Sequence, residues 1–179
     1  MATVNTVTST TSVAATTRNP MALVRSIVVT GLFIGVVGSV DFATFFYLTL
    51  HMPPIAVFQY VASGLLGPSA FAGGYATALL GILIHFVIAF VVAAVFILAA
   101  NQMVFLRRTA WVFVAGLVYG AAVNMVMSMA VLPYSAAPRM QVTATLIVHG
   151  LIADALIVGL PVAFAVWYTA RANKASVAA

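Results

Sequence analysis

Four polar side chains stand out in this sequence because each lies within a long apolar run. Asp41, His85, Asn124 and Asp154 belong to four different runs, and the two aspartates are the only acidic residues in the chain. Ionisable groups in apolar surroundings are costly, so they face a protein interior or a water-filled cavity. Carboxylate, imidazole and amide groups can exchange protons, bind a small solute or hydrogen-bond to one another. These four residues are the candidate polar layer of the protein.

The composition describes the surroundings of this layer. Of the 179 residues, 65% are hydrophobic and only 5% are charged. Soluble domains average about 25% charged residues, and a soluble fold as apolar as this one could not cover its surface. The sequence therefore predicts an integral membrane protein, with the lipid bilayer as its principal partner. Its length fits one domain.

Several kinds of function find no support in the residues. The seven basic residues are dispersed, so no basic stripe offers a nucleic-acid surface. Cysteine is absent, which excludes disulfides, thiolate metal sites and cysteine nucleophiles. No Ser-His-Asp order with supporting glycines, P-loop or HExxH motif occurs. We expect no enzyme, no catalytic residue and no nucleic-acid partner.

Three methionines of the third predicted span could suggest a copper site. Met125, Met127 and Met129 alternate with other residues and would spread around a helix. Thioethers select Cu(I), but this spacing favours packing and lipid contact. No metal site is predicted.

The apolar runs predict an all-α, integral membrane four-helix bundle. A helix needs about 20 residues to cross a bilayer, and we predict spans at about 23–50, 75–100, 111–132 and 142–168. Between the first two spans, residues 55–68 are apolar but too short to cross. Pro54 suits a first helical turn there, and this segment predicts a short interfacial helix.

The ends of the chain are predicted to lie outside the membrane domain, which runs from 21 to 170. Residues 1–20 are rich in Thr, Ser and Ala and predict a disordered N-terminal tail. Residues 171–179 predict a C-terminal tail. Lys and Arg concentrate on the cytoplasmic side of membrane proteins. With four alternating spans, one side carries Arg18, Arg25, Arg107, Arg108, Arg171 and Lys174, and the other carries only Arg139. Both termini are therefore predicted to be cytoplasmic.

Each predicted span has a face of small residues at helical spacing. Small residues every fourth position let helix backbones approach closely in lipid. The glycines that we expect to pack helices together are Gly31, Gly35, Gly81, Gly116, Gly120 and Gly150. A closely packed bundle is predicted.

Counting residues along each span places the polar layer at one depth, in the outer half of the membrane. Asp41, His85 and Asn124 each lie 16 residues from the inner end of their span, about 24 Å at 1.5 Å per residue. Asp154 lies 17 residues from Arg171, or about 26 Å. Within this layer we predict that Asp41 lies near His85 and that Asn124 lies near Asp154. His149 is predicted to lie more than one turn further out.

The layer has three alternative interpretations. Its members could satisfy one another and fix the register of the helices, since polar contacts between helices are common in membranes. They could form a proton or solute site open to the outer side. Finally, His85 and His149 could hold haem b as paired axial ligands in a helical bundle.

Short motifs give the chain a resemblance to a group of small bacterial inner-membrane proteins, similar to the YagU-like family. The motifs lie between about residues 25 and 168 and comprise Gly31-Leu32-Phe33-Ile34-Gly35, Gly81-Ile82-Leu83-Ile84-His85-Phe86, Gly116-Leu117-Val118-Tyr119-Gly120, Leu132-Pro133 with Pro138, and Val148-His149-Gly150. The resemblance implies a four-span fold and a bacterial inner membrane. It brings no substrate and no catalytic residue.

The first expectation for function is a non-enzymatic four-span membrane protein that serves as an accessory or structural subunit of a larger membrane complex. The alternative is a small proton-linked carrier or solute-binding protein that uses the polar layer, and a carrier of this size would have to form a homodimer. The third candidate is an electron-transfer subunit with haem b.

Overall fold

The structure, a computed structural model, describes residues 20–103, 106, 110–141 and 143–178. Every regular element in these ranges is helical, which confirms the all-α prediction for them. The first half contains α1 (Pro20–Leu50), α2 (Pro54–Leu66), the 3₁₀ helix η1 (Gly67–Ala72) and α3 (Gly74–Gln102). The second half contains α5 (Trp111–Val126), the π-helical turn η2 (Met127–Val131), α6 (Leu132–Tyr134), α7 (Ala144–Asp154), the π-helical turn η3 (Ala155–Gly159) and α8 (Leu160–Ala178).

Four long helical rods correspond to the four predicted spans. They are α1, α3, the continuous run from α5 through α6, and the continuous run from α7 through α8. All four are long and apolar enough to cross a membrane, and so by length and composition is Pro54–Ala72, which joins α2 and η1. The predicted C-terminal tail is helical in its described part, because α8 continues to Ala178.

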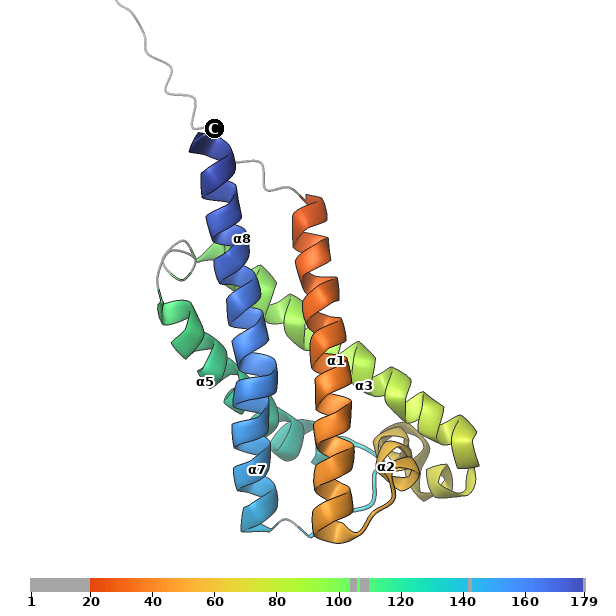
Figure 1. Cartoon of the computed structure of the whole chain (residues 1–179). Coiled ribbons are helices and arrows are strands. Elements are labelled where there is room, and N and C mark those ends of the chain that lie inside the picture. The colour runs from red at the N-terminus through yellow and green to blue at the C-terminus, as the bar shows by residue number, and fades with distance from the viewer. Residues whose placement is uncertain (1–19, 104–105, 107–109, 142, 179) are drawn as a thin grey trace, which may run out of the picture.

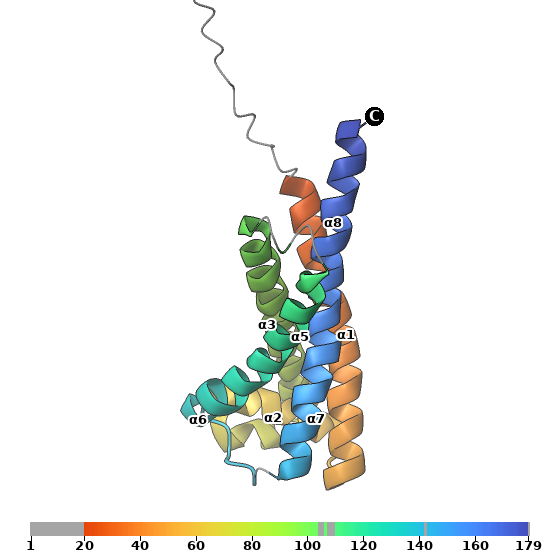
Figure 2. The same ribbon diagram turned by 90° about the vertical axis from the view of Figure 1, so that its left-hand side faces the viewer.

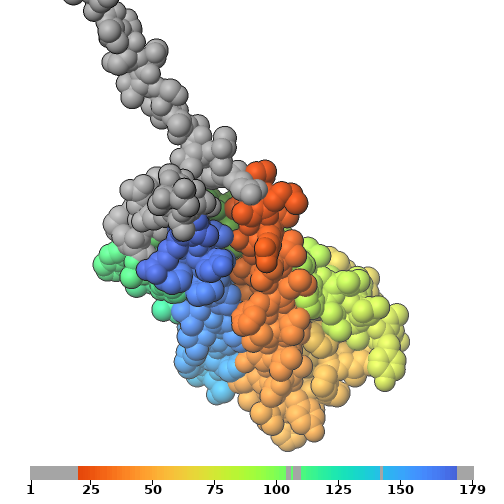
Figure 3. All heavy atoms as spheres, turned by 45° about the horizontal axis from the view of Figure 1, so that its top comes forward, coloured from red at the N-terminus to blue at the C-terminus, as the bar shows by residue number. Residues whose placement is uncertain are grey.

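The rods share two ends (Figures 1 and 2). One end holds the start of α1, the end of α3, the start of α5 and the end of α8. The opposite end holds the end of α1, the short helix α2, the start of α3, α6 and the start of α7. On the surface, α1 and α8 lie side by side, as Figure 3 shows.

The short helix α2 forms where the sequence predicted it. Pro54 occupies its first turn, and Gly67 ends it with a φ of 66°, a left-handed conformation that glycine adopts without strain. The side-chain amide of Gln59 donates to the carbonyl of Gly74 at 2.9 Å, and the N–H of Ala136 donates to the carbonyl of Gly64 at 3.0 Å. These bonds attach α2 to the start of α3 and to the loop after α6.

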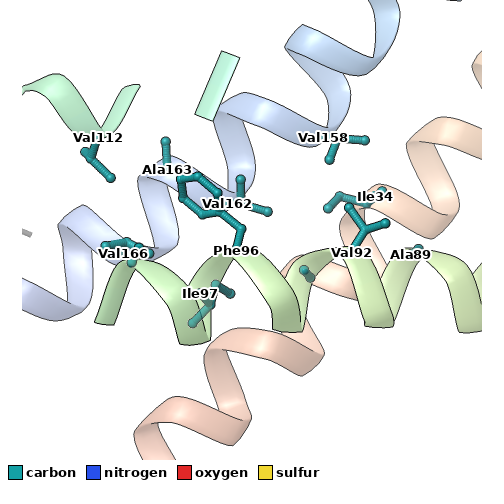
Figure 4. Close-up of a cluster of buried hydrophobic side chains, with 12 residues drawn as sticks. Ile34, Ala89, Val92, Phe96, Ile97, Val112, Val158, Val162, Ala163 and Val166 are labelled. Atoms are coloured by element: carbon teal, nitrogen blue, oxygen red, sulfur yellow. The ribbon is translucent and has the colours of Figure 1, made fainter. Parts of the chain in front are cut away.

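A core of aliphatic side chains holds α3, α5 and α8 together (Figure 4). Ile97 of α3, Val112 of α5 and Val162 of α8 are almost fully buried there. Tyr119 adds a polar contact, since its hydroxyl donates to the carbonyl of Val92 at 2.8 Å. Large aliphatic side chains such as Leu83, 56% exposed, cover the outside of the rods. An apolar exterior of this kind suits contact with lipid.

Aromatic rings of α3 pack against glycines of α1, one ring for each helical turn. A Cβ atom at Gly35 would lie 2.6 Å from the ring of Phe86, and one at Gly31 would overlap the ring of Phe90. At Gly38 the same position would lie 3.3 Å from Nε2 of His85. The predicted packing role of Gly31 and Gly35 thus corresponds to a series of ring contacts that sets how α1 lies on α3.

Candidate polar site

The polar site begins where α5 crosses the rod formed by α7, η3 and α8. A Cβ atom at Gly116 would overlap the carbonyl oxygen of Gly159, and one at Gly120 would overlap the carbonyl oxygen of Asp154. Backbones this close require glycine on at least one side of each contact. The crossing therefore brings the next turn of α5, which carries Asn124, against the end of α7.

Asn124 and Asp154 are joined across this crossing. The Nδ2 group of Asn124 donates a hydrogen bond to Oδ2 of Asp154 at 3.1 Å. Gly150 makes room for the amide, because a Cβ atom there would lie 2.5 Å from Nδ2 of Asn124. The predicted contact between Asn124 and Asp154 is present, and Gly150 is the residue that permits it.

A second polar pair joins α1 to α7. Nε2 of His149 lies 3.4 Å from Oδ1 of Asp41. The imidazole also stacks on the ring of Phe45, with ring centroids 3.6 Å apart and planes within 7°. The side chains of Asp41 and His149 remain 33% and 30% exposed. This pair is the more accessible part of the site.

The two pairs form one group, which we name the polar cluster: Asp41 of α1, Asn124 of α5, and His149 and Asp154 of α7. Asp154 lies within electrostatic range of both Asp41 and His149. Three helices that are distant in sequence therefore contribute to the polar cluster, and α7 supplies two of its four members.

His85 does not pair with Asp41, so the predicted pairing is wrong. Its Nε2 atom is buried against α1 beside Gly38 and makes no hydrogen bond of ordinary geometry to the described residues, although the imidazole lies near the backbone of Gly35. Depth along a span says nothing about rotation around its axis, and the ring contacts between α1 and α3 turn His85 toward the glycine face. His149, predicted to lie further out, takes its place beside Asp41.

The predicted packing glycines all lie at helix contacts. Gly31 and Gly35 meet α3, Gly116 and Gly120 meet η3 and the end of α7, Gly150 meets Asn124, and Gly81 lies against the backbone of α2 near Phe58. The prediction omitted Gly159, which faces Gly116 across the crossing. Its signal in the sequence was Pro161 two residues later, a sign of an irregular turn in the last span.

Three described basic residues belong to segments at the two ends of the rods. Arg25 and Arg171 belong to the start of α1 and the end of α8, at the same end of the molecule, and Arg139 belongs to the loop at the opposite end. The guanidinium of Arg171 lies 4.0 Å from the centre of the Trp167 ring. Arg18, Arg107, Arg108 and the side chain of Lys174 lie outside the described residues.

The polar cluster combines two carboxylates, one imidazole and one amide. Within the described ranges, no group of three His, Cys, Asp or Glu side chains has the arrangement of a metal site. Two carboxylates and one imidazole give the cluster a net negative charge whenever both acids are ionised, whether or not His149 is protonated. Binding a proton reduces that charge in surroundings where a charge is costly.

Comparison with known proteins adds no relative. No protein-family model, curated protein or solved structure matches this chain. The resemblance to YagU-like proteins stays a prediction. The polar cluster is the feature of the chain that bears on function.

Proposed function

We propose that this chain is a non-enzymatic, four-span protein of a bacterial inner membrane that binds and exchanges protons at its polar cluster, as a small proton-linked carrier or solute-binding protein. Its termini are cytoplasmic, and the polar cluster lies in the outer half of the membrane. The segment formed by α2 and η1 lies at the outer surface in this proposal and is not a fifth span.

The observation that supports the proposal is the convergence of Asp41, His149 and Asp154 with Asn124. Membrane-embedded acids and histidines that lie together are typical of proton pathways. The imidazole of His149 and the two carboxylates lie close enough for the charge of one group to affect the others. About a third of the Asp41 and His149 side chains stays exposed, so the other helices of this chain do not seal this pair.

The second candidate is the accessory subunit, in which the polar cluster only fixes the helices. One observation favours it: Asn124 with Asp154, and His149 with Asp41, already satisfy one another. A stabilising cluster has no need to exchange protons. The two functions therefore differ in whether a change in pH moves charge at these residues.

A pH jump separates the two functions. Purified protein in vesicles on a solid-supported membrane is moved rapidly from about pH 8 to about pH 5, the range over which histidine titrates. We expect a transient current from proton binding, which is clearly smaller in the double variant Asp41→Asn/Asp154→Asn. These substitutions keep the size of both side chains and remove their charge.

His85→Phe is the matched control, because it removes a buried histidine outside the polar cluster. This variant should keep the current of the unmodified protein. A current of equal size in the unmodified protein and the double variant would contradict the proposal and favour the accessory subunit.

The haem alternative stays a prediction. In the structure, the imidazole of His149 contacts Asp41 and Phe45, and that of His85 lies against Gly38. Both rings are thus packed on α1, and neither contact favours their joint use as axial ligands.

A further inference from the structure

We propose that the π-helical turn η3, maintained by Pro161, is the positioning element that directs Asp154 and His149 into the polar cluster. The inference adds a positioning residue to the site of the proposed function. It concerns the orientation of α7, and so it can be tested whether or not the polar cluster exchanges protons.

The spacing of the contacts with α5 carries the inference. On α5 the contact residues Gly116, Gly120 and Asn124 follow one another at steps of four, as one face of an α-helix requires. On the opposite rod, Gly116 meets the carbonyl oxygen of Gly159, Gly120 meets that of Asp154, and Asn124 meets Gly150; Ala163 and Ala155 lie beside the first two contacts. The step from Gly150 to Asp154 is four residues, whereas the step from Asp154 to Gly159 is five.

Two residues that are five positions apart lie on the same face only if the helix between them is wider than an α-helix. Each residue of an α-helix turns the chain by about 100°, so a regular helix would rotate Asp154 away from the face defined by Gly159. A π-helical turn contains about one residue more than an α-helical turn. The π-helical turn η3 comprises Ala155–Gly159, the five residues that follow Asp154. The turn therefore places the polar end of α7 and the glycine crossing on one face.

Pro161 gives a physical reason for the turn. Proline has no N–H to donate to the carbonyl four residues earlier, and its ring clashes with that carbonyl. The affected carbonyl belongs to Ile157, in the middle of η3. Widening the helix there relieves the clash. Leu160, the preceding residue, still donates its N–H to the carbonyl of Leu156, so the helix resumes at once.

The rod formed by α5, η2 and α6 contains the same arrangement in a position where it directs nothing into the cluster. Its π-helical turn, Met127–Val131, precedes Pro133, and the N–H of Leu132 donates to the carbonyl of Met127, five residues earlier. This turn follows Asn124 and all the α5 glycines of the crossing. Pro133 is therefore a matched control for Pro161.

A disulfide measures the orientation of α7 directly. The chain has no cysteine, so the pair Asn124→Cys/Gly150→Cys reports only the contact between these two positions. Oxidation of the purified protein in mild detergent should form the bond readily. The bond is quantified as the loss of maleimide labelling, and the same pair is then combined with each further change.

Adding Pro161→Ala should lower the extent of the disulfide by roughly tenfold, because cysteines whose Cβ atoms point apart cannot be bridged without moving the backbone. Adding Pro133→Ala should leave it unchanged. Equal bond formation with Pro161→Ala and Pro133→Ala would overturn the role of Pro161.

A deletion distinguishes loss of orientation from loss of folding. In the Pro161→Ala background, removing Leu156 reduces the five-residue step to four, so a regular α-helix should restore the disulfide. Removing Ile147 instead, before Gly150, leaves the step at five and should not restore it. Both side chains are exposed, at 49% and 45%. Failure of the Leu156 deletion to exceed the Ile147 deletion would overturn the inference. The pH-jump current tests the proposed function separately.

Discussion

Two histidines of this chain use the same imidazole group in two different ways. His149 contacts a carboxylate through Nε2 and stacks on an aromatic ring. His85 continues the series of rings from α3 that occupy the glycines of α1, and its buried Nε2 makes no hydrogen bond of ordinary geometry to the described residues. The imidazole of His85 is thus used for its shape, and that of His149 for its charge and hydrogen bonding.

This difference predicts opposite effects of the same substitution. His85→Phe keeps a ring against Gly38 and removes a buried polar atom, whose desolvation penalty is about 1–3 kcal/mol. We expect its melting temperature in mild detergent, followed by circular dichroism, to be unchanged or raised. His149→Phe leaves Asp41 without its partner and should lower the melting temperature. Equal losses in the two variants would contradict the assignment.

At the scale of helices, the site depends on the crossing of α5 with the rod that contains η3. The backbones of Gly116 and Gly159 face each other with no side chain between them. Backbone atoms cannot move aside as a flexible ring can, so glycine is required at this point. The contact at Gly38 is different, since a Cβ atom there would lie 3.3 Å from a side-chain atom.

Gly116→Ala should therefore separate α5 from η3 and weaken the Asn124–Asp154 hydrogen bond. Overpacking of this kind costs about 1–3 kcal/mol, and we expect unfolding at a lower concentration of denaturing detergent. Gly38→Ala is the matched control and should unfold close to the unmodified protein. If both variants unfold alike, the crossing does not depend on glycine.

Much of this arrangement could be predicted from the sequence, because apolar length and small-residue spacing are local properties. From these two properties we predicted the four long rods, the short helix after Pro54 and the contact between Asn124 and Asp154. The partner of Asp41 could not be predicted, since depth leaves rotation about the helix axis undetermined. Gly159 was missed because a periodicity of 3.6 residues does not describe a π-helical turn.

For the whole molecule, the main feature is the asymmetry of its two ends. Arg25 and Arg171 lie at one end, and α2, η1 and the loop after α6 lie at the other. Basic residues concentrate on the cytoplasmic side. The proposed orientation therefore puts the segment from α2 to η1 outside the cell membrane.

Labelling of single cysteines tests this orientation. We choose Ser69 of η1, which is exposed, Ser135, which is partly exposed, and Ala110, which is exposed before α5. Cysteines at 69 and 135 should react with an impermeant maleimide added to spheroplasts, and a cysteine at 110 should react only after lysis. Ser63, by contrast, is fully buried and is unsuitable for labelling. Labelling at 110 in sealed spheroplasts would reverse the orientation.

The composition of the polar cluster also has a consequence for biosynthesis. Asp41 is translated about a hundred residues before His149. At about 5–20 residues per second, roughly 5–20 s pass between the synthesis of Asp41 and that of His149. During this interval an ionised Asp41 within a bilayer would lack its partner, at a cost of about 2.5–3.5 kcal/mol or more. Synthesis of α7 supplies that partner, so the polar cluster is complete only when the last of the four rods is being made.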